Sequence, residues 1–472
     1  LAHLAEKCHE RSISLCMDFV MNHTSDEHEW ARRARAGEGE YMSRYFFTGD
    51  QSLIERYTRD VPQVFPTTAP GHFTYLPELG QSVMTQFYPY QWDLNYKNPR
   101  VFNEMMYNFL YLANQGMDVI RIDAVPYIWK QLGTNCRNLP QVHTIVRMMR
   151  MISEVVCPGI VLLGEVVMAP VEVVPYFGTT DKPECHMLYN VTTMATTWNS
   201  VACRDTRLLR RQLEAVCGLP RTCTFLNYLR CHDDIGWGLD YATLSDWGME
   251  EVPHKRYLNA YFQGHAEGST SRGELYNPVT GDARFCATTA SMCGVEAAGF
   301  AGDAQAMDVA LRKDIMLHAY LLTQSGLPIV YSGDEVGQVN DYTYHDDPER
   351  ADDSRYLHRG RFDWSLVDRT DEPGTVQQRL YDALRHLESI RRDEAVFEAD
   401  AEVGVVGYSD PAILWIRRRA GEKTLHAVFN FSDEDRTLWM PERADYTNLM
   451  SGKRTEFETF DLAAWDFRWW LR

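Results

Sequence analysis

The sequence predicts a β/α barrel followed by an all-β domain. Amphipathic helices lead repeatedly into short apolar strands, which we expect at 13–20, 117–123, 160–166, 223–229 and 327–335. Short, continuously apolar strands alternating with helices indicate a parallel sheet that is covered on both faces. Repeated over roughly the first two thirds of the chain, this pattern favours a closed barrel over an open sheet.

The elements follow in order along the chain. The chain opens inside a helix, with Leu1, Leu4, Ala5 and Cys8 on one face. Further helices are expected at 99–115, 141–156, 205–216 and 304–324, each ahead of a strand. From about residue 395 the pattern changes to alternating short strands such as "VGVVGY", "AILWIRRR" and "LHAVFNF", which predict a β-sandwich.

Two turn-rich segments interrupt the alternation. Residues 24–98 are rich in Pro, Gly, Tyr and Phe and show little helical period after Ala36, and residues 235–303 are looser still. We interpret them as two inserted domains. The predicted layout is a barrel from 1–23, 99–234 and 304–394, with a carboxyl-terminal domain at 395–472.

Composition limits the partners and the compartment. A net charge of −19 argues against nucleic acid and anionic membranes. The 11 cysteines show no CxxC pairing and often lie in apolar runs, which is typical of reduced thiols in the cytoplasm. No apolar stretch of transmembrane length and no signal peptide is visible. The 12% aromatic content fits either a large core or stacking surfaces for a sugar.

Ionisable residues gather where four predicted strands end. In a β/α barrel, the carboxyl ends of the strands carry the chemistry. Four clusters at one face are hard to explain as helix caps, although Asp18 and Asn22 are expected to be structural. The clusters are Asp18 with Asn22 and His23, Arg121 with Asp123, Glu165 alone, and Arg230 with His232, Asp233 and Asp234.

The spacing of Arg121 and Asp123 places both side chains on one side of their strand. We expect Arg121 to hold Asp123 ionised, and Glu165 to keep its proton in a more apolar surround. A charged carboxylate beside a protonated one is the arrangement of a retaining glycosidase, whose carboxyls lie about 5–5.5 Å apart. Arg230 is expected to offset the charges of Asp233 and Asp234.

A metal site is the alternative. His23, Asp123, Glu165, His232 and Asp233 contain the donor types of a mixed site. Each histidine, however, stands alone and is flanked by Asn or Asp, without the His-x-His pattern usual in barrel metallohydrolases. We therefore predict neither a metal nor a cofactor.

Four motifs then carry a family resemblance. "DFVMNH" (18–23), "VIRIDAV" (119–125), "LLGEV" (162–166) and "LRCHDD" (229–234) resemble, in order, the signature regions of the α-amylase family, glycoside hydrolase family 13. "YPYQWDLNYKNPRVF", "CHDDIGW" and "DDSRYLHR" are similar to the amylosucrase and sucrose hydrolase group. This similarity covers nearly the whole chain.

The resemblance implies a role for each matching residue. Asp123 would be the nucleophile, Glu165 the general acid and base, and Asp233 the carboxylate that stabilises the transition state. The substrate-binding residues would be His23, Phe87, Gln91, Arg121, His232, Asp234 and Arg355. Arg355 would form the pocket floor, paired with an acid outside this chain, and Asp234 would lie towards the acceptor.

The implied activity is transfer of glucose from sucrose to an α-1,4-glucan through a covalent glucosyl-enzyme. The alternatives are sucrose hydrolysis, action on another α-glucoside, and a non-catalytic binding subunit. The resemblance also implies that two barrel strands and a helical domain precede Leu1 in a longer protein. A chain without them is expected to have open sheet edges and can lack activity alone.

Overall fold

The computed structural model describes residues 1–66, 69–168, 170–276 and 283–472. The chain divides into two compact units, Leu1–Tyr189 and Asn190–Arg472. This boundary falls inside the predicted catalytic segment 99–234, so the predicted domain layout stays a prediction. The predicted insertions include residues 67–68 and 277–282, which lie outside the described residues.

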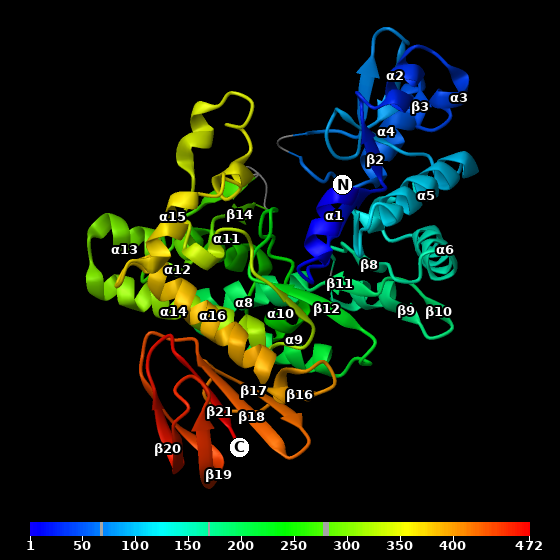
Figure 1. Ribbon diagram of the computed structural model, residues 1–472. Helices are drawn as coiled ribbons and strands as arrows, with labels where there is room; N and C mark the ends of the chain where they lie inside the picture. The colour runs from blue at the N-terminus through cyan, green and yellow to red at the C-terminus, as the bar shows by residue number, and fades with distance from the viewer. Residues whose placement is uncertain (67–68, 169, 277–282) are drawn as a thin grey trace. The chain divides into compact units, whose positions relative to one another are not determined.

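The first unit contains four parallel strands in the order β1-β7-β8-β11. They are β1 (Cys16–Val20), β7 (Val119–Asp123), β8 (Val161–Gly164) and β11 (Met187–Tyr189). The helices α1 (Ala2–His9), α5 (Pro99–Asn114) and α6 (Pro140–Val156) precede the first three of them (Figure 1). Every helix and strand expected before residue 165 is therefore present.

Local sequence signals begin and end these helices. The Asn98 side chain caps α5 by accepting a hydrogen bond from the Arg100 amide, and Pro99 fills the first helical turn. After α5 the chain turns at Gly116, whose φ is 90°. A Cβ atom there would lie 2.8 Å from the Cβ of Ala5, so glycine allows α1 to pack closely against the turn.

The segment 24–98 is built from short elements. Two small antiparallel sheets, β2-β6 and β3-β5-β4, are accompanied by three helices. The 10-residue helix α4 corrects the expectation of little helix after Ala36. The elements are β2 (His23–Ser25), α2 (Glu29–Arg35), α3 (Gly39–Met42), β3 (Phe47–Thr48), α4 (Gln51–Asp60), β4 (Phe73–Leu76), β5 (Gln81–Met84) and β6 (Gln91–Asp93).

The second unit contains two parallel strands of the barrel type, β12 (Thr224–Tyr228) and β15 (Leu327–Ile329), paired from Leu226 opposite Leu327. The helices around them include α8 (Val191–Cys203), α9 (Arg207–Cys217), α14 (Ala304–Thr323) and α16 (Val376–Asp393). Helices α14 and α16 pack side by side (Figure 1). Strand β11 and helix α8 were not predicted from the sequence.

The segment 235–303 is mostly helical where it is described. A two-stranded sheet of β13 (Glu274–Tyr276) and β14 (Arg284–Cys286) joins the helices. These are α10 (Tyr241–Asp246), α11 (Glu251–Phe262), α12 (Thr289–Cys293) and α13 (Val295–Ala301). The expected loose insertion therefore contains a substantial amount of regular structure.

The carboxyl-terminal segment is all-β, as predicted. Its six strands form one antiparallel sheet in the order β16-β17-β18-β21-β19-β20. The strands are β16 (Glu402–Val405), β17 (Ile413–Ala420), β18 (Lys423–Asn430), β19 (Arg436–Asn448), β20 (Arg454–Leu462) and β21 (Phe467–Leu471). The pairing register of β19 shifts between Trp439 and Ala444. An irregularity of this kind bends a strand. The sheet encloses a hydrophobic core that includes Trp415 and Tyr446.

A buried arginine fastens this sheet to the helices of the second unit. The Arg418 guanidinium donates to the carbonyl oxygens of Thr323, Val396 and Glu398. Because the side chain is only 2% exposed, these bonds also satisfy a cation that would otherwise be buried without partners.

Two barrel strands lie at sheet edges. Among the described residues, β1 pairs with β7 alone, and Asp18 on it is 51% exposed. Strand β15 ends the order of the sheet, and its Leu327 and Ile329 are 49% and 37% exposed. Open sheet edges were expected, and these apolar side chains lie at one of them.

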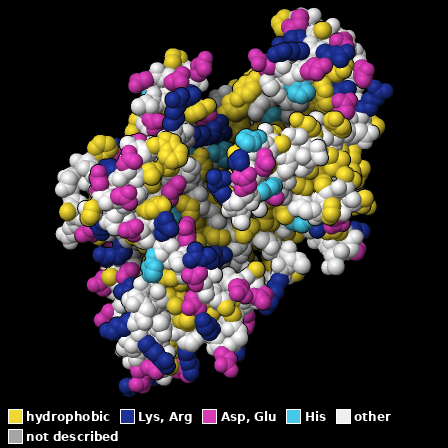
Figure 2. Space-filling view, viewed as in Figure 1, with side chains coloured by type: hydrophobic (Ala, Val, Ile, Leu, Met, Phe, Trp, Pro, Cys, Tyr) yellow, Lys and Arg dark blue, Asp and Glu magenta, His cyan; other side chains and the backbone are white. Residues whose placement is uncertain are grey.

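The surface mixes charges of both signs, as the visible face in Figure 2 shows. Among the described residues, no helix is both long and apolar enough to cross a membrane. All eleven cysteines are free thiols.

Candidate active site

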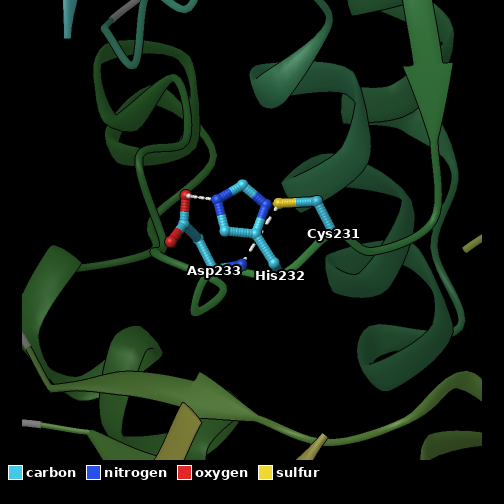
Figure 3. Close-up of side chains that lie close together, drawn as sticks. All are labelled: Cys231, His232 and Asp233. Carbon is cyan, nitrogen blue, oxygen red and sulfur yellow. Dashed lines mark hydrogen bonds and ion pairs between the residues drawn. The ribbon is translucent and has the colours of Figure 1, made fainter. Parts of the chain in front are cut away.

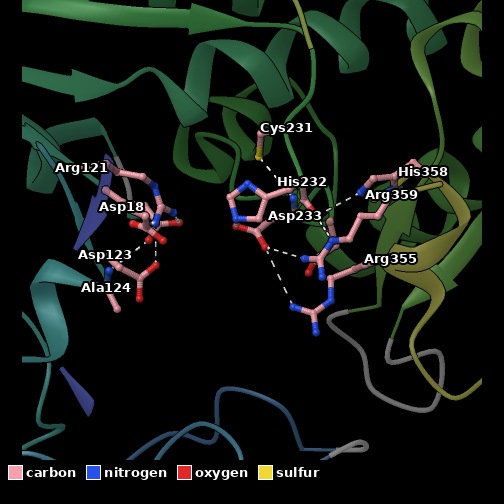
Figure 4. A network of polar contacts seen from close by, with 12 residues as sticks. Asp18, Arg121, Asp123, Ala124, Cys231, His232, Asp233, Arg355, His358 and Arg359 are labelled. Carbon is pink, nitrogen blue, oxygen red and sulfur yellow. Dashed lines mark hydrogen bonds and ion pairs between the residues drawn. The ribbon is translucent and has the colours of Figure 1, made fainter. Parts of the chain in front are cut away.

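One guanidinium joins three carboxylates in the first unit. Arg121 Nη1 lies 2.8 Å from Asp123 Oδ1 and 2.6 Å from Asp18 Oδ1, and Nη2 lies 3.0 Å from Glu165 Oε1 (Figure 4). The Arg121 side chain is 7% exposed. Burial alone would lower the pKa of Arg121, but the carboxylates of Glu165, Asp123 and Asp18 outweigh it and raise the pKa. The predicted pairing of Arg121 with Asp123 is confirmed.

Glu165 lies in a different environment from the one expected. Besides the contact with Arg121, its Oε2 accepts a hydrogen bond from the Ala124 amide at 3.0 Å. The expectation of an apolar surround is wrong, because the second terminal nitrogen of Arg121 reaches the end of the neighbouring strand. Ala124 has a φ of 48°, which turns its amide out of the strand after Asp123.

Gly164 sets the close packing of the strand that ends before Glu165. A Cβ atom at Gly164 would lie 2.7 Å from Cys185 Sγ and 2.9 Å from Leu188 Cδ2. Only glycine leaves this space free, so the close approach of β8 to its neighbours fixes where Glu165 begins.

His23 starts β2 and is 8% exposed. Burial lowers its pKa, although the carboxylates of Asp93 and Asp123 act in the opposite direction. The ring of Phe87 lies 5.2 Å from the His23 ring and 5.1 Å from that of Tyr127. His23 and Phe87, two of the predicted sugar-binding residues, are therefore in contact with each other.

Gln91 uses its side chain locally. Its Oε1 atom accepts a hydrogen bond from the Tyr88 amide at 3.2 Å. The side chain is partly exposed, so a ligand contact remains compatible with this position.

A buried lysine escaped the sequence analysis. Lys130 Nζ lies 2.7 Å from Asn22 Oδ1, 2.8 Å from Asp93 Oδ1 and 2.5 Å from the Tyr127 carbonyl oxygen. The side chains of Lys130 and Asp93 are both fully buried. Asn22 also donates to Asp93 Oδ1, at 2.9 Å, which supports the structural role expected for Asn22. A single Lys in the apolar segment "VPYIWKQL" is the signal that could have pointed to this cluster.

The second group of predicted residues follows β12 in the second unit. Cys231, His232 and Asp233 place a sulfur, a ring nitrogen and a carboxylate oxygen within 4.8 Å of one another (Figure 3). The Asp233 amide donates to Cys231 Sγ at 3.4 Å, and His232 Nε2 lies 3.5 Å from Asp233 Oδ2. His232 is 46% and Asp233 34% exposed, so both side chains are accessible to a ligand.

This cluster differs from the metal set considered from the sequence. Its donors are a soft thiol, an imidazole and one carboxylate, all from three successive residues. The guanidinium of Arg359 already lies 3.2 Å from Asp233 Oδ1. A cation bound to Asp233 would be repelled by that charge, so the surroundings favour an uncharged polar ligand over a metal.

Arg359 was not predicted as a site residue. In addition to Asp233, it donates to the His232 carbonyl oxygen (Figure 4). His358 Nε2 lies 3.3 Å from the same carbonyl oxygen. The segment "LHR" therefore holds His232 and Asp233 from one side. In the sequence, the only signal that could have pointed to Arg359 is its spacing of four residues from Arg355.

Arg355 finds a partner within its own loop. It forms a bidentate pair with Asp353, with Nε–Oδ1 at 2.8 Å and Nη2–Oδ2 at 2.6 Å. Its Nη1 atom lies 4.0 Å from Asp233 Oδ1. Arg355 thus lies near Asp233. The expected partner outside this chain stays a prediction, while the "DDSR" turn places the Asp353 carboxylate two residues before Arg355.

Two further expectations for this group are corrected. Asp234 is only 6% exposed and pairs with Arg284 of β14 at 3.3 Å, which favours an anchoring role over acceptor binding. Burial raises the pKa of Asp234. Arg230 pairs with the buried Asp334 at 2.7 Å rather than with Asp233 or Asp234, because its side chain is directed into the core.

Comparison with known proteins identifies the family to which the first half of the chain is related. Residues 1–234 match the model of the α-amylase catalytic domain. Residues 1–234 belong to the α-amylase family. Asp123, Glu165 and Asp233 all lie within the matched range, as do the four motifs on which the resemblance rests.

Enzymes of the α-amylase family that carry different names are similar to the chain in sequence. A trehalose synthase from Pimelobacter sp. (strain R48) is 33% identical over 236 residues, 48% of this chain and 40% of that protein. A glucosylglycerate phosphorylase from Spirochaeta thermophila is 26% identical over 409 residues, 86% of this chain and 65% of that protein. The chain thus spans about two fifths of the trehalose synthase and about two thirds of the phosphorylase.

The fold has close structural counterparts in the α-amylase family. The trehalulose synthase of Pseudomonas mesoacidophila MX-45 superposes with a TM-score of 0.70 at 18% identity, covering 100% of this chain and 85% of that one. The predicted α-amylase-type barrel is confirmed.

Proposed function

We propose that the protein is an α-retaining enzyme that transfers a glucosyl group from a small α-glucoside. The observation that carries the proposal is the contact of one buried guanidinium, that of Arg121, with both Asp123 and Glu165. A retaining mechanism needs two carboxyl groups a short distance apart. Carboxylates that share one guanidinium meet that need.

In the first step, the Asp123 carboxylate attacks the anomeric carbon of the glucosyl donor. The bond from that carbon to the leaving oxygen breaks, and the oxygen takes a proton from Glu165. Arg121 holds the nucleophile in place through the contact of 2.8 Å with Asp123 Oδ1. For Asp233, which Arg359 contacts at 3.2 Å, the family resemblance implies that it would stabilise the positive charge that develops on the sugar ring.

In the second step, Glu165 acts as a base. It takes the proton of an acceptor hydroxyl while the acceptor oxygen attacks the anomeric carbon, and Asp123 leaves as a carboxylate. Water as the acceptor gives hydrolysis, and a sugar hydroxyl gives transfer. His23 and Phe87, which contact each other, would bind the glucosyl ring.

The proposed donor is sucrose and the proposed acceptor an α-1,4-glucan, on the strength of the "QWDLN" and "DDSR" motifs. Trehalose or maltose is the second candidate donor, favoured by the 33% identity to a trehalose synthase. Phosphate is a further acceptor to test, because phosphorylases match most of the chain. The free thiols support a reducing compartment such as the cytoplasm.

The experiment is a donor and acceptor panel on the protein expressed from its natural coding sequence. Sucrose, maltose and trehalose are supplied separately, each with water, a maltooligosaccharide or phosphate as acceptor. Release of fructose from sucrose supports the lead candidate, and the appearance of glucan, free glucose or glucose phosphate identifies the acceptor. Turnover of trehalose or maltose with no fructose from sucrose would move the donor to the second candidate.

A matched inactive variant controls for contaminating enzymes. Asp123→Asn removes the nucleophile but keeps the size of the side chain, so it should fold like the wild type and turn over none of the three donors. Absence of turnover by the wild type on the whole panel would contradict the proposal.

A further inference from the structure

A continuous row of aromatic rings leads from His23 to the surface of the first unit. Phe87 lies 5.2 Å from His23, Phe65 6.0 Å from Phe87, Tyr88 5.0 Å from Phe65, and Tyr90 5.4 Å from Tyr88. The two ends of the row differ in exposure, which is 8% at His23 and 52% at Tyr90. The row therefore begins at a predicted sugar-binding histidine and ends in water.

The outer two rings are parallel. Tyr88 and Tyr90 are stacked with an interplanar angle of 22°. Tyr88 and Tyr90 lie directly before β6, and the turn there brings their rings together. A stack buries one face of each ring, so the exposed area of a half-exposed Tyr90 includes its edge and its outer surface.

The backbone that carries these rings is fixed by hydrogen bonds. The Tyr88 amide donates to Gln91 Oε1 at 3.2 Å, and the Tyr88 carbonyl oxygen accepts from the Gln91 amide at 2.8 Å. The Tyr90 carbonyl oxygen accepts from the Asp26 amide at 2.8 Å. Little ordering is then needed when a ligand binds, which lowers the entropic cost of using Tyr90 as a contact surface.

We infer that Tyr88 and Tyr90 form a stacking platform for a hexopyranose ring of the acceptor. The inference rests on the proposed function, since an acceptor sugar enters only if glucosyl transfer occurs. The C–H face of a pyranose is apolar and its hydroxyls are polar, and a tyrosine offers the matching combination of an apolar ring and a polar hydroxyl. His23 and Phe87 lie at the inner end of the same row, where the transferred glucosyl ring is proposed to bind.

The chemistry of the segment favours a neutral sugar over phosphate. Residues 87–91 read "FYPYQ" and contain no charged side chain. Phosphate recognition depends on cations or on several converging backbone amides. A segment without charged side chains fits the apolar face of a neutral sugar better than phosphate.

Tyr90→Ala is the test, with Tyr111→Ala as its control. Tyr111 is a tyrosine of α5 that is 53% exposed, against 52% for Tyr90, so both changes remove the same side chain from a similar surface position. The first readout is the binding of maltotriose to the protein in the absence of donor, measured by saturation-transfer nuclear magnetic resonance. The second is the apparent KM for maltotriose as acceptor and the ratio of transfer to hydrolysis.

Loss of one aromatic contact should weaken maltotriose binding and raise its KM by about two- to tenfold. The products should shift towards free glucose, Tyr90→Phe should retain most of the binding, and Tyr111→Ala should behave like the wild type. Unchanged maltotriose binding in Tyr90→Ala would overturn the platform. Because binding is measured without donor, a failure of the proposed function, seen as no turnover of any donor, can be told apart from a failure of the platform.

Discussion

Replacing Lys130 by Met would leave the Asp93 carboxylate without its cation in a site closed to water. The side chains of both residues are fully buried, and Lys130 Nζ lies 2.8 Å from Asp93 Oδ1. Removing one partner of a buried ion pair costs about 3–5 kcal/mol. Asp93 keeps hydrogen bonds from Asn22 and from the Gln86 amide, at 2.9 and 2.6 Å, so we expect the low end, about 3 kcal/mol.

The effect should be local, because Asp93 belongs to the segment 24–98 and Lys130 follows β7. A chain with several folded parts does not unfold in one step, so amide hydrogen exchange is a better assay than a single melting curve. The Leu94 amide, which donates to the Asn22 carbonyl oxygen, reports on this contact directly. A loss of about 3 kcal/mol in the opening free energy corresponds to about a hundredfold faster exchange at Leu94.

A double variant separates loss of charge balance from loss of packing. Asp93→Asn removes the charge and keeps an oxygen for the Gln86 amide. Combined with Lys130→Met, it leaves a neutral pocket, so the double variant should regain at least half of the lost opening free energy. Exchange at Leu94 that rises less than threefold in Lys130→Met, or rises further in the double variant, would refute this reasoning.

Three other predictions concern the site and the carboxyl-terminal sheet. Arg359→Ala should lower kcat by about tenfold or more with a smaller change in KM, because Asp233 loses the cation that lies 3.2 Å away. Equal effects on kcat and KM would contradict this prediction. Gly164→Ala should destabilise the protein by about 1–3 kcal/mol and lower its activity, because the new Cβ would lie 2.7 Å from Cys185 Sγ. Adding Cys185→Gly to this variant should recover part of the stability and part of the activity. Burial lowers the pKa of His426 to about 4, so its contribution to stability is present above pH 6.5 and is lost as the pH falls towards 4. Denaturant unfolding of the carboxyl-terminal sheet should show a loss of about 2 kcal/mol between pH 8 and pH 5 that is absent in His426→Gln, and an equal loss in both proteins would argue against this assignment.

Much of the barrel could be read from the sequence because its signals are local. The strands at 16–20, 119–123 and 161–164 are short apolar runs that follow amphipathic helices, and all three are present. Helix α8 escaped because its sequence, "VTTMATTWNSVAC", is rich in Thr and buried on all sides. Such a sequence has neither helical period nor high helix propensity. Its helix depends on burial in the second unit.

The site was predicted in part for a similar reason. Arg121 and Asp123 are two residues apart on one strand, so their contact follows from strand geometry. The contacts of Arg121 with Glu165, of Lys130 with Asp93 and of Arg359 with Asp233 join distant parts of the chain. No local pattern encodes such pairs, and they appear only when the tertiary structure brings the partners together.

The covalent intermediate on Asp123 tests the central claim most directly. Glu165→Gln removes the base of the second step, while α-glucosyl fluoride does not need an acid to release its leaving group. The variant should therefore accumulate a glucosyl-enzyme when mixed with this donor. Peptide mass spectrometry is expected to find one anhydroglucose unit on the peptide that contains Asp123. A label on another residue, or fluoride release with no labelled peptide, would contradict the account.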